Sequence, residues 1–262
     1  MIRVLVIARM VWLDLLRRKD MYVLLILLAG LLLALLSLNI YGLGGLVRYV
    51  KDAGLLLAWR CSWILAISVA SRQLPQEENR RTIFSLLAKP LTRGELLLGK
   101  WLGAWTVVCA ATALFYLLIV LVVAARGGRF ETATLAQAGL LHALSLGVLT
   151  ALALALSTRA TQSAAAALAY VCALAGYLIL PRVPVFLAAE SGLRANGLMV
   201  LYYALPHLEL FDMRQRAVHD WGPAPGAFIA GLVLYSLVWI ALLLLLGWLG
   251  YRRKRFTRGE AR

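Results

Sequence analysis

The spacing of Gly94, Gly99 and Lys100 matches the first seven positions of the phosphate-binding loop pattern. In such a loop, backbone amides hold the phosphates, and a Ser or Thr after the lysine reaches the magnesium ion. Here Trp101 occupies that position, Glu95 and three leucines separate the glycines, and no buried strand precedes them. We therefore expect no nucleotide hydrolysis and no cofactor in this chain. Any role driven by ATP requires a separate chain that holds ATP and magnesium.

Histidine and acidic residues in the C-terminal third carry the ligand atoms that zinc or copper prefers. One residue separates His207 from Glu209, and His219 directly precedes Asp220. This spacing matches no recognised metal site, and histidines beside acids are common on solvated surfaces. We therefore predict no metal site here, with a metal role as the alternative.

A histidine and a serine also share one apolar stretch, where His142 lies three residues before Ser145. We interpret His142 as a histidine that forms hydrogen bonds between packed helices, with half of a catalytic dyad as the alternative. Cys61, Cys109 and Cys172 lie singly in apolar segments, with no C-x-x-C pair, and are interpreted as small apolar side chains. The sequence thus predicts a chain that is not an enzyme.

The elements that must position these residues are membrane spans. Of the 262 residues, 63% are hydrophobic, against roughly 45–50% in an average soluble domain, which excludes a soluble protein. A net charge of +15 would indicate nucleic acid in a soluble protein, but in a membrane protein Lys and Arg collect at the anionic cytoplasmic face. We predict that the chain contacts a lipid bilayer and no nucleic acid.

Six apolar stretches are long enough to cross a bilayer as helices of about 20 residues. We predict an all-α polytopic membrane protein with a single transmembrane domain over residues 1–262. Of the 27 Lys and Arg residues, 18 fall on the side of the termini and 8 on the other side, so both termini are predicted to be cytoplasmic. The predicted spans are 21–41, 54–74, 101–125, 137–157, 163–180 and 227–250.

The first 20 residues are predicted to form an interfacial amphipathic helix in the plane of the cytoplasmic leaflet. At 100° per residue four of the charged residues fall in one sector, and the apolar residues spread over the remainder. No small-residue cleavage site follows, as a signal peptide would require. An extension of the first span is the alternative. The charged sector contains Arg3, Asp14, Arg17 and Arg18.

Small residues predict close packing of the spans. The third span opens with Gly99 and Gly103, and the fourth has a small residue at every fourth position, which lets another helix approach. The sequence does not say which helices pair. Arg60 is the one charge inside a span and is predicted to extend outward to the surface. The small positions of the fourth span are Gly139, Ala143, Gly147, Ala151 and Ala155.

The stretch between the second and third spans is predicted to be a folded cytoplasmic segment rather than a flexible linker. After Pro75, residues 76–88 read as a short helix with acidic residues in its first turn, where the helix dipole favours them. Pro90 ends this helix, because the residue before proline disfavours helical dihedral angles. The acidic residues are Glu77 and Glu78, and the apolar face contains Ile83, Phe84, Leu86 and Leu87.

A second helix is predicted to begin after Thr92 and to continue into the third span. Thr92 and Glu95 match a capping box, in which each side chain accepts a hydrogen bond from the backbone of the other residue. The short helix, the turn and the second helix, which enters the membrane, would together form a rigid charged projection into the cytoplasm. A loop that lies passively on lipid headgroups is the alternative.

The segment EENRRTIFSLLAKPLTRGELLLGKWLG, residues 77–103, resembles the cytoplasmic loop of ABC-2-type permeases, the membrane subunits of bacterial ATP-binding-cassette exporters. The six spans, the N-terminal interfacial helix and the extracytoplasmic segment 181–226 are also as expected for this family. The resemblance implies the ABC-2-type exporter fold in a bacterial inner membrane. YYALPHLELFDMR, residues 202–214, further resembles the branch that includes the gliding-motility and copper-maturation permeases.

The resemblance implies that residues 75–98 form a coupling region, whose coupling helix docks in a groove of an ABC ATPase subunit. Two ATPases that close on two ATPs would pull two such helices together, so a second permease copy is implied, as a homodimer or a heterodimer. The implied charged contacts are Glu77, Glu78, Arg80 and Arg81, with Ile83, Phe84 and Leu87 on the apolar face and Lys89, Pro90 and Arg93 fixing the turn.

The sequence therefore predicts the permease subunit of an ABC transporter. It would couple ATP hydrolysis in a partner to export of an unknown substrate or to force transmission across the membrane. Two alternatives stay open. An intramembrane enzyme needs a nucleophile and a base at one depth in the bundle, and a stand-alone secondary carrier usually needs an intramembrane carboxylate, which the predicted spans lack.

Overall fold

A computed structural model of the chain describes residues 2–16, 22–23, 26–27, 29–30, 46–79, 92–187 and 192–252. These residues form helices and contain no β-strand, as the all-α prediction requires. Among them, five helices are long and apolar enough to cross a membrane. The last five predicted spans each coincide with one of these helices. Most of the first predicted span, 21–41, lies outside the described residues.

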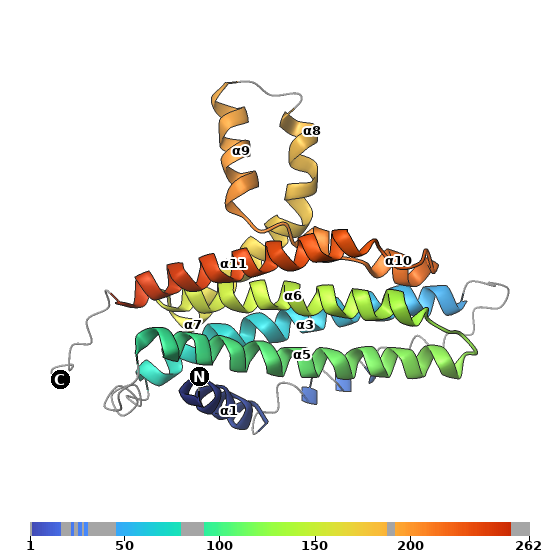
Figure 1. Cartoon of the computed structure of the whole chain (residues 1–262), viewed down its shortest axis with the longest axis horizontal. Coiled ribbons are helices and arrows are strands. Elements are labelled where there is room, and N and C mark those ends of the chain that lie inside the picture. Colours follow the sequence, from blue (N-terminus) through green and yellow to red (C-terminus); the bar gives the residue numbers. More distant parts are fainter. Residues whose placement is uncertain are drawn as a thin grey trace.

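Four of the five spanning helices run roughly along the long axis of the molecule (Figure 1). At 1.5 Å per residue, the 33 residues of α5 extend about 50 Å, well beyond the ~30 Å hydrocarbon core of a bilayer. Their ends therefore reach past the membrane core. Four are single helices, namely α3 (Leu46–Asn79), α5 (Arg93–Ala125), α6 (Thr132–Ser157) and α11 (Gly226–Arg252).

The fifth span changes its helical type along its length. It begins as α7 (Gln162–Leu174), continues as the π-helix η1 (Ala175–Ile179) and the 3-10 turn η2 (Leu180–Arg182), and ends as α8 (Val183–Leu187). Together with α9 (Leu193–Ala204), α8 forms a hairpin that projects steeply from the bundle (Figure 1). The chain then returns to the bundle through the 3-10 turn η3 (Leu208–Phe211) and α10 (Arg214–His219).

The small residues of α6 receive neighbours from two sides. Trp105 of α5 donates a hydrogen bond from Nε1 to the carbonyl oxygen of Ala143 at 2.8 Å. On α11, a Cβ atom added to Gly247 would lie 3.2 Å from Cα of Ala155. Gly139 has no heavy atom within 4 Å of such a Cβ position. The structure thus shows what the sequence did not predict, namely that α5 and α11 pack against the row of small residues on α6.

Candidate functional site

The end of α3 and the start of α5 flank residues 80–91 and lie at the same end of the bundle as α1 (Ile2–Leu16) and the end of α11 (Figure 1). A separate helix beginning at Gln76 is wrong, because α3 continues through Pro75 to Asn79. The proline removes only one backbone hydrogen bond. Leu74 and Pro75 are both buried, and this packing keeps the last turn helical.

An ion pair joins α3 to α5 near these ends. Lys100 donates from Nζ to Oε1 of Glu77, and the two side chains are only 8% and 17% exposed. The resemblance implies that Glu77 contacts a partner, but its carboxylate lies inside the bundle. Removal of one member of such a buried pair typically destabilises a protein by about 3–5 kcal/mol, because it leaves an unpaired charge.

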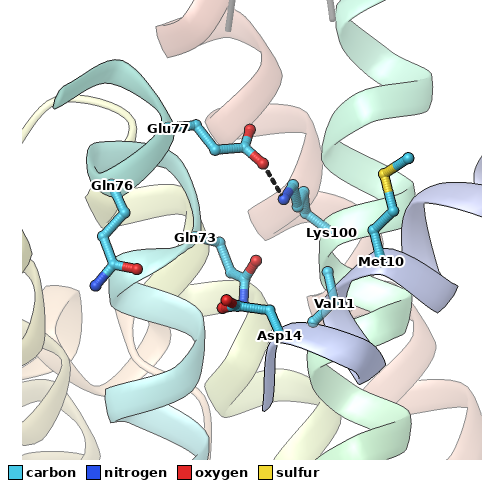
Figure 2. A pocket seen from close by; sticks show the side chains of 7 residues that line it. All are labelled: Met10, Val11, Asp14, Gln73, Gln76, Glu77 and Lys100. Atoms are coloured by element: carbon cyan, nitrogen blue, oxygen red, sulfur yellow. Dashed lines mark hydrogen bonds and ion pairs between the residues drawn. The ribbon is translucent and has the colours of Figure 1, made fainter. Parts of the chain in front are cut away.

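A pocket of ≈ 200 Å³ lies beside this ion pair, between α1, α3 and α5. Figure 2 shows that residues from all three helices surround it. The sequence did not predict this pocket, because its lining residues come from three segments that are far apart in the chain. The lining residues are Met10, Val11, Asp14, Gln73, Gln76, Glu77 and Lys100.

The predicted capping box at the start of α5 is present. The backbone N–H of Glu95 donates to Oγ1 of Thr92 at 3.2 Å, and the backbone N–H of Thr92 donates to Oε2 of Glu95 at 2.9 Å. Thr92 also donates from Oγ1 to the same carboxylate at 3.0 Å. These bonds fix the direction in which the chain enters α5.

Arg93, next to the capping box, connects α5 to α11. Its Nη1 donates to the carbonyl oxygens of Tyr251 and Arg252, each at 2.9 Å. These carbonyls lie at the C-terminal end of α11, where the helix dipole favours a positive charge. A residue that the resemblance assigns to the turn therefore ties the first residue of α5 to the last turn of α11.

Helix α1 packs along α5 through two glycines. A Cβ atom added to Gly99 would lie 2.7 Å from Cβ of Ile7, and one added to Gly103 would lie 2.9 Å from Cα of Ala8. One turn further on, Trp12 donates from Nε1 to Oγ1 of Thr106 at 2.9 Å. The two helices thus run side by side in the same direction. A helix is present over Ile2–Leu16 of the predicted 1–20. Its location in the plane of the cytoplasmic leaflet stays a prediction, and its packing against α5 was not predicted.

The other residues of the predicted coupling region divide into two groups. Glu78 lies in the last turn of α3 and is half-buried. The rest lie outside the described residues, so their roles stay predictions. They are Arg80, Arg81, Ile83, Phe84, Leu87, Lys89 and Pro90.

Toward the opposite end of the bundle, Arg214 ties the segment after α9 to the spanning helices. Its Nη2 donates to Oδ2 of Asp212 and to the hydroxyl of Tyr177, each at 2.7 Å. Tyr177 in turn donates to the same carboxylate oxygen at 2.7 Å. Burial alone raises the pKa of Asp212, but the hydrogen bonds and charge of Arg214 outweigh it and hold the pKa below its usual value. Asp212 therefore stays ionised.

The π-helix brings Tyr177 to this network. A Cβ atom added to Gly176 would lie 2.6 Å from the carbonyl oxygen of Pro206, so only glycine permits this approach. The extra residue of a π-helical turn rotates the side chains that follow it, and such turns are frequent at functional sites. The sequence contains no periodic signal that predicts the π-helix.

A second buried network surrounds His142. Its Nε2 lies 2.8 Å from Oγ of Ser62, and its Nδ1 lies 3.3 Å from the hydroxyl of Tyr116. Ser145 instead donates to the carbonyl of His142 at 2.8 Å, so the pair weighed as a catalytic dyad does not form. Ser62 also donates to the carbonyl of Trp59 at 2.9 Å. Ser62 and His142 are completely buried, as packing residues are.

Arg60, predicted to extend outward, lies against aromatic rings. Its guanidinium carbon is 5.5 Å from the ring centroid of Trp63 and 5.2 Å from that of Tyr177. Contact with the negative faces of two rings stabilises the cation. The guanidinium of Arg60 therefore contacts aromatic side chains of the bundle and does not extend only into solvent.

The first histidine and acid pair lies beside α11. The hydroxyl of Tyr235 accepts a hydrogen bond from the backbone N–H of His207 at 2.9 Å and lies 3.2 Å from Nδ1 of the same residue. Burial lowers the pKa of His207 and raises the pKa of Glu209 to about 7. Within the part of the chain that the structure describes, neither His207 Nε2 nor Glu209 Oε2 has a hydrogen-bond partner.

The second pair has different neighbours. The ring of His219 stacks on that of Trp221, with centroids 5.2 Å apart. Asp220 accepts from Nζ of Lys51 at 2.9 Å. Across residues 2–16, 46–79, 92–187 and 192–252, no three His, Cys, Asp or Glu side chains come together in a way that could hold a metal ion.

The two ends thus differ in what they can do. The end near α1 holds helix termini that are joined by charged contacts, which suits the transmission of a movement. The opposite end holds buried networks, which join Arg214 to Asp212 and Tyr177 and surround His142.

Comparison with known proteins places the chain in a family. A family model described as ABC-2 family transporter protein matches residues 61–259, from within α3 to beyond the end of α11. No curated protein matches the chain. The finer resemblance to the gliding-motility and copper-maturation branch stays a prediction.

Proposed function

The chain belongs to the ABC-2 family of transporter proteins, and from this we propose that it couples ATP hydrolysis in a separate ABC ATPase to movement of a substrate or of force across the membrane. As a member of this family it is a multi-pass membrane protein and a permease subunit of an ABC transporter. Permeases of this kind generally work with an ABC ATPase.

The main support for coupling is the set of contacts on either side of residues 80–91. Glu77 in the last turn of α3 is held by Lys100 of α5. Arg93, the first residue of α5, is held by the end of α11. A force on the segment between these helix ends therefore acts on α3, α5 and α11 together.

The proposed movement begins when the ATPase subunit binds residues 80–91 and displaces them. Because α1 packs against Gly99 and Gly103 with almost no free space, it moves with α5. One chain supplies one such segment, so two copies are required for two ATPases to close on two ATPs. The helix ends near α1 then face the cytoplasm, in a bacterial inner membrane, and a homodimer is the simplest assembly.

The experiment changes Arg80→Glu together with Arg81→Glu in a tagged chain. The wild-type chain, purified from its native membrane, is expected to retain an ABC ATPase at one copy per permease. The double variant should insert normally but lose this ATPase, because its two positive contacts become negative. The matched control, Arg126→Glu with Arg129→Glu at the opposite end of α5, should retain it.

The same purification distinguishes the alternatives. An intramembrane enzyme or a secondary carrier works without an ATPase, so a wild-type chain that is fully active alone in vesicles contradicts the proposal. Equal ATPase retention by the wild type and the double variant contradicts the docking role of residues 80–91.

A further inference from the structure

Arg60 is the one charged residue in the middle of α3. Between Asp52 and Arg72 this helix carries no other charge. At 1.5 Å per residue, the helix between these two residues extends about 30 Å, which is the thickness of the hydrocarbon core. Arg60 therefore lies about 12 Å from the level of Asp52 and about 18 Å from the level of Arg72. A charge at such a depth is costly and marks the path of a substrate or an ion.

No carboxylate neutralises this charge in the part of the chain that the structure describes. The guanidinium of Arg60 forms no ion pair and no hydrogen bond there. The carboxylate of Asp212 is bound by Arg214 through Nε at 2.9 Å and Nη2 at 2.7 Å, so these two charges compensate each other. Residues 21–45 contain no Asp or Glu, so the predicted first span has no carboxylate to offer. Arg60 therefore leaves one positive charge in excess.

Two aromatic rings hold the guanidinium of Arg60 in place without a hydrogen bond. Its carbon is 5.2 Å from the ring centroid of Tyr177 and 5.5 Å from that of Trp63. The two rings are nearly perpendicular, with centroids 5.5 Å apart. The hydroxyl of Tyr177 donates to Asp212 and accepts from Arg214, which fixes the ring. Attraction to ring faces leaves the five N–H donors of an arginine available to an acceptor from outside the chain.

A second donor beside Arg60 also lacks an acceptor. The side chain of Trp63 is 3% exposed, and among the described residues its Nε1 has no hydrogen-bond partner. A buried donor without an acceptor is costly, and the membrane core contains no water to supply one. Because the ring of Trp63 contacts the guanidinium, an anion with several oxygens is placed to accept from both residues.

The open side of α3 lets a guest reach these donors. Of residues 54–75 in this helix only five are not buried, and they follow one another at helical spacing. Leu56 and Ile64, one turn on either side of Arg60, are 41% and 44% exposed. Arg60 is thus the polar centre of a narrow apolar surface, which fits a guest with one charged group and an apolar part. The five residues are Leu56, Leu57, Arg60, Ile64 and Ser68.

We propose that Arg60 and Trp63 bind the oxyanion of an amphipathic guest, a carboxylate or phosphate attached to an apolar chain. The planar guanidinium matches such groups with two parallel hydrogen bonds. The apolar chain of the guest lies along Leu56 and Ile64. This inference rests on the proposed function, since a permease subunit with such a site moves an amphipathic anion and holds its charge at Arg60 part of the way across the bilayer.

The experiment measures binding of dodecyl phosphate to the full chain by native mass spectrometry in a neutral detergent. Dodecanol, which has the same apolar chain without the charge, is the matched probe. We expect one saturable dodecyl phosphate per chain, bound at least about tenfold more tightly than dodecanol, because hydrogen bonds between charged groups are the stronger ones. Dodecyl phosphate that binds no more tightly than dodecanol overturns the proposal.

Substitutions at the two donors test the position of the site. Arg60→Gln keeps a hydrogen-bonding side chain without the charge and should abolish the preference for dodecyl phosphate. Arg48→Gln, at an exposed residue near the start of α3, changes the net charge equally and should preserve it. Trp63→Phe keeps a ring, removes Nε1 and should weaken the binding of dodecyl phosphate about threefold. A preference that survives in Arg60→Gln overturns the site, and unchanged binding in Trp63→Phe overturns the role of Nε1.

A variant at Ile64 keeps the test decisive even where Arg60→Gln fails to fold. Ile64→Glu places a carboxylate of the chain itself one turn from Arg60, and this carboxylate should displace dodecyl phosphate. Ile64→Gln is the uncharged control and should retain the binding. Undiminished binding of dodecyl phosphate to Ile64→Glu overturns the proposed site.

A final arm separates an amphipathic anion from a free one. Inorganic phosphate replaces dodecyl phosphate, and we expect binding at least about a hundredfold weaker, because it has no apolar chain to bury on α3. Inorganic phosphate that binds as tightly overturns the assignment to an amphipathic guest. Every arm uses the chain without an ATPase, so a failure here is distinct from a failure of the proposed function.

Discussion

The two ends of the bundle use polar residues in different ways. Near α1, charged contacts join the termini of helices that a driven movement must keep together, such as Arg93 with the end of α11. Toward the other end, Arg214, Asp212 and Tyr177 bind one another inside the protein and tie the segment after α9 to a spanning helix. The first arrangement transmits displacement, and the second fixes a segment in place.

This difference indicates where stability and motion reside. A network whose members are all satisfied inside the protein is costly to break, because each orphaned charge loses both water and its partner. Helix-terminal contacts such as a cap contribute about 1 kcal/mol each, and they can be remade in a second position. We therefore expect changes at the opposite end to affect stability. Changes to the helix-terminal contacts near α1 should affect coupling, with the exception of the buried Glu77–Lys100 pair, whose loss should also affect stability.

The largest effect is expected for Arg214→Leu, which leaves the charge of Asp212 buried without its partner. We expect a loss of about 3–5 kcal/mol in the free energy of unfolding, measured by thermal unfolding in detergent. The double variant with Asp212→Leu should recover most of it. Arg194→Leu, at an exposed arginine of α9, is the control. A loss no greater than that of the control would break the comparison between the two ends.

A smaller and more local effect is expected for Gly103→Ala. The added Cβ would lie 2.8 Å from Cβ of Val11 and 2.9 Å from Cα of Ala8, so α1 must move away. Overpacking of this kind costs about 1–3 kcal/mol, and it should appear as faster labelling of a cysteine placed in α1.

The matched control for that substitution is Gly139→Ala, where nothing lies within 4 Å of the added Cβ. This helical position should be neutral or stabilised by about 0.5–1 kcal/mol. Equal labelling of α1 in both variants would contradict the view that α1 moves as one body with α5.

The smallest effect is a pH dependence from Glu209. Burial raises its pKa from 4.5 to about 7, so the folded chain holds this proton more tightly than the unfolded chain. Its contribution therefore favours the fold most in acid, and declines as the pH rises from 4.5 to about 7.

Glu209→Gln should remove this slope and raise stability above pH 7 by about 1 kcal/mol, because solvent partly screens the half-buried carboxyl. Unfolding temperatures between pH 5 and pH 8 measure the slope. Glu131→Gln, at an exposed residue before α6, controls for the loss of one charge. An unchanged slope would show that another group near α11 titrates.

Features that depend on neighbouring residues could be predicted from the sequence. The capping box of Thr92 and Glu95 involves residues only three apart, and both hydrogen bonds are present. The apolar stretches after residue 46 likewise correspond to spanning helices. In each case the free energy comes from burial or bonding within one segment, so the segment alone specifies it.

Features that depend on distant residues could not be predicted in the same way. Ser62 and His142 are 80 positions apart and meet only because α3 packs on α6. Gly99 and Gly103 indicated a close helix without identifying α1 as that helix. Pro75 predicted the end of a helix, but tertiary packing outweighed the local preference. A proline therefore predicts the end of a helix less reliably where neighbouring helices pack around it.

The course of α1 along α5 also bears on how the chain is made. The glycines that accept α1 follow it by about 90 residues, so α1 leaves the ribosome well before its groove exists. At about 5–20 residues per second, this interval is on the order of ten seconds. The side of α1 that later meets Gly103 is therefore uncovered until translation has passed α5.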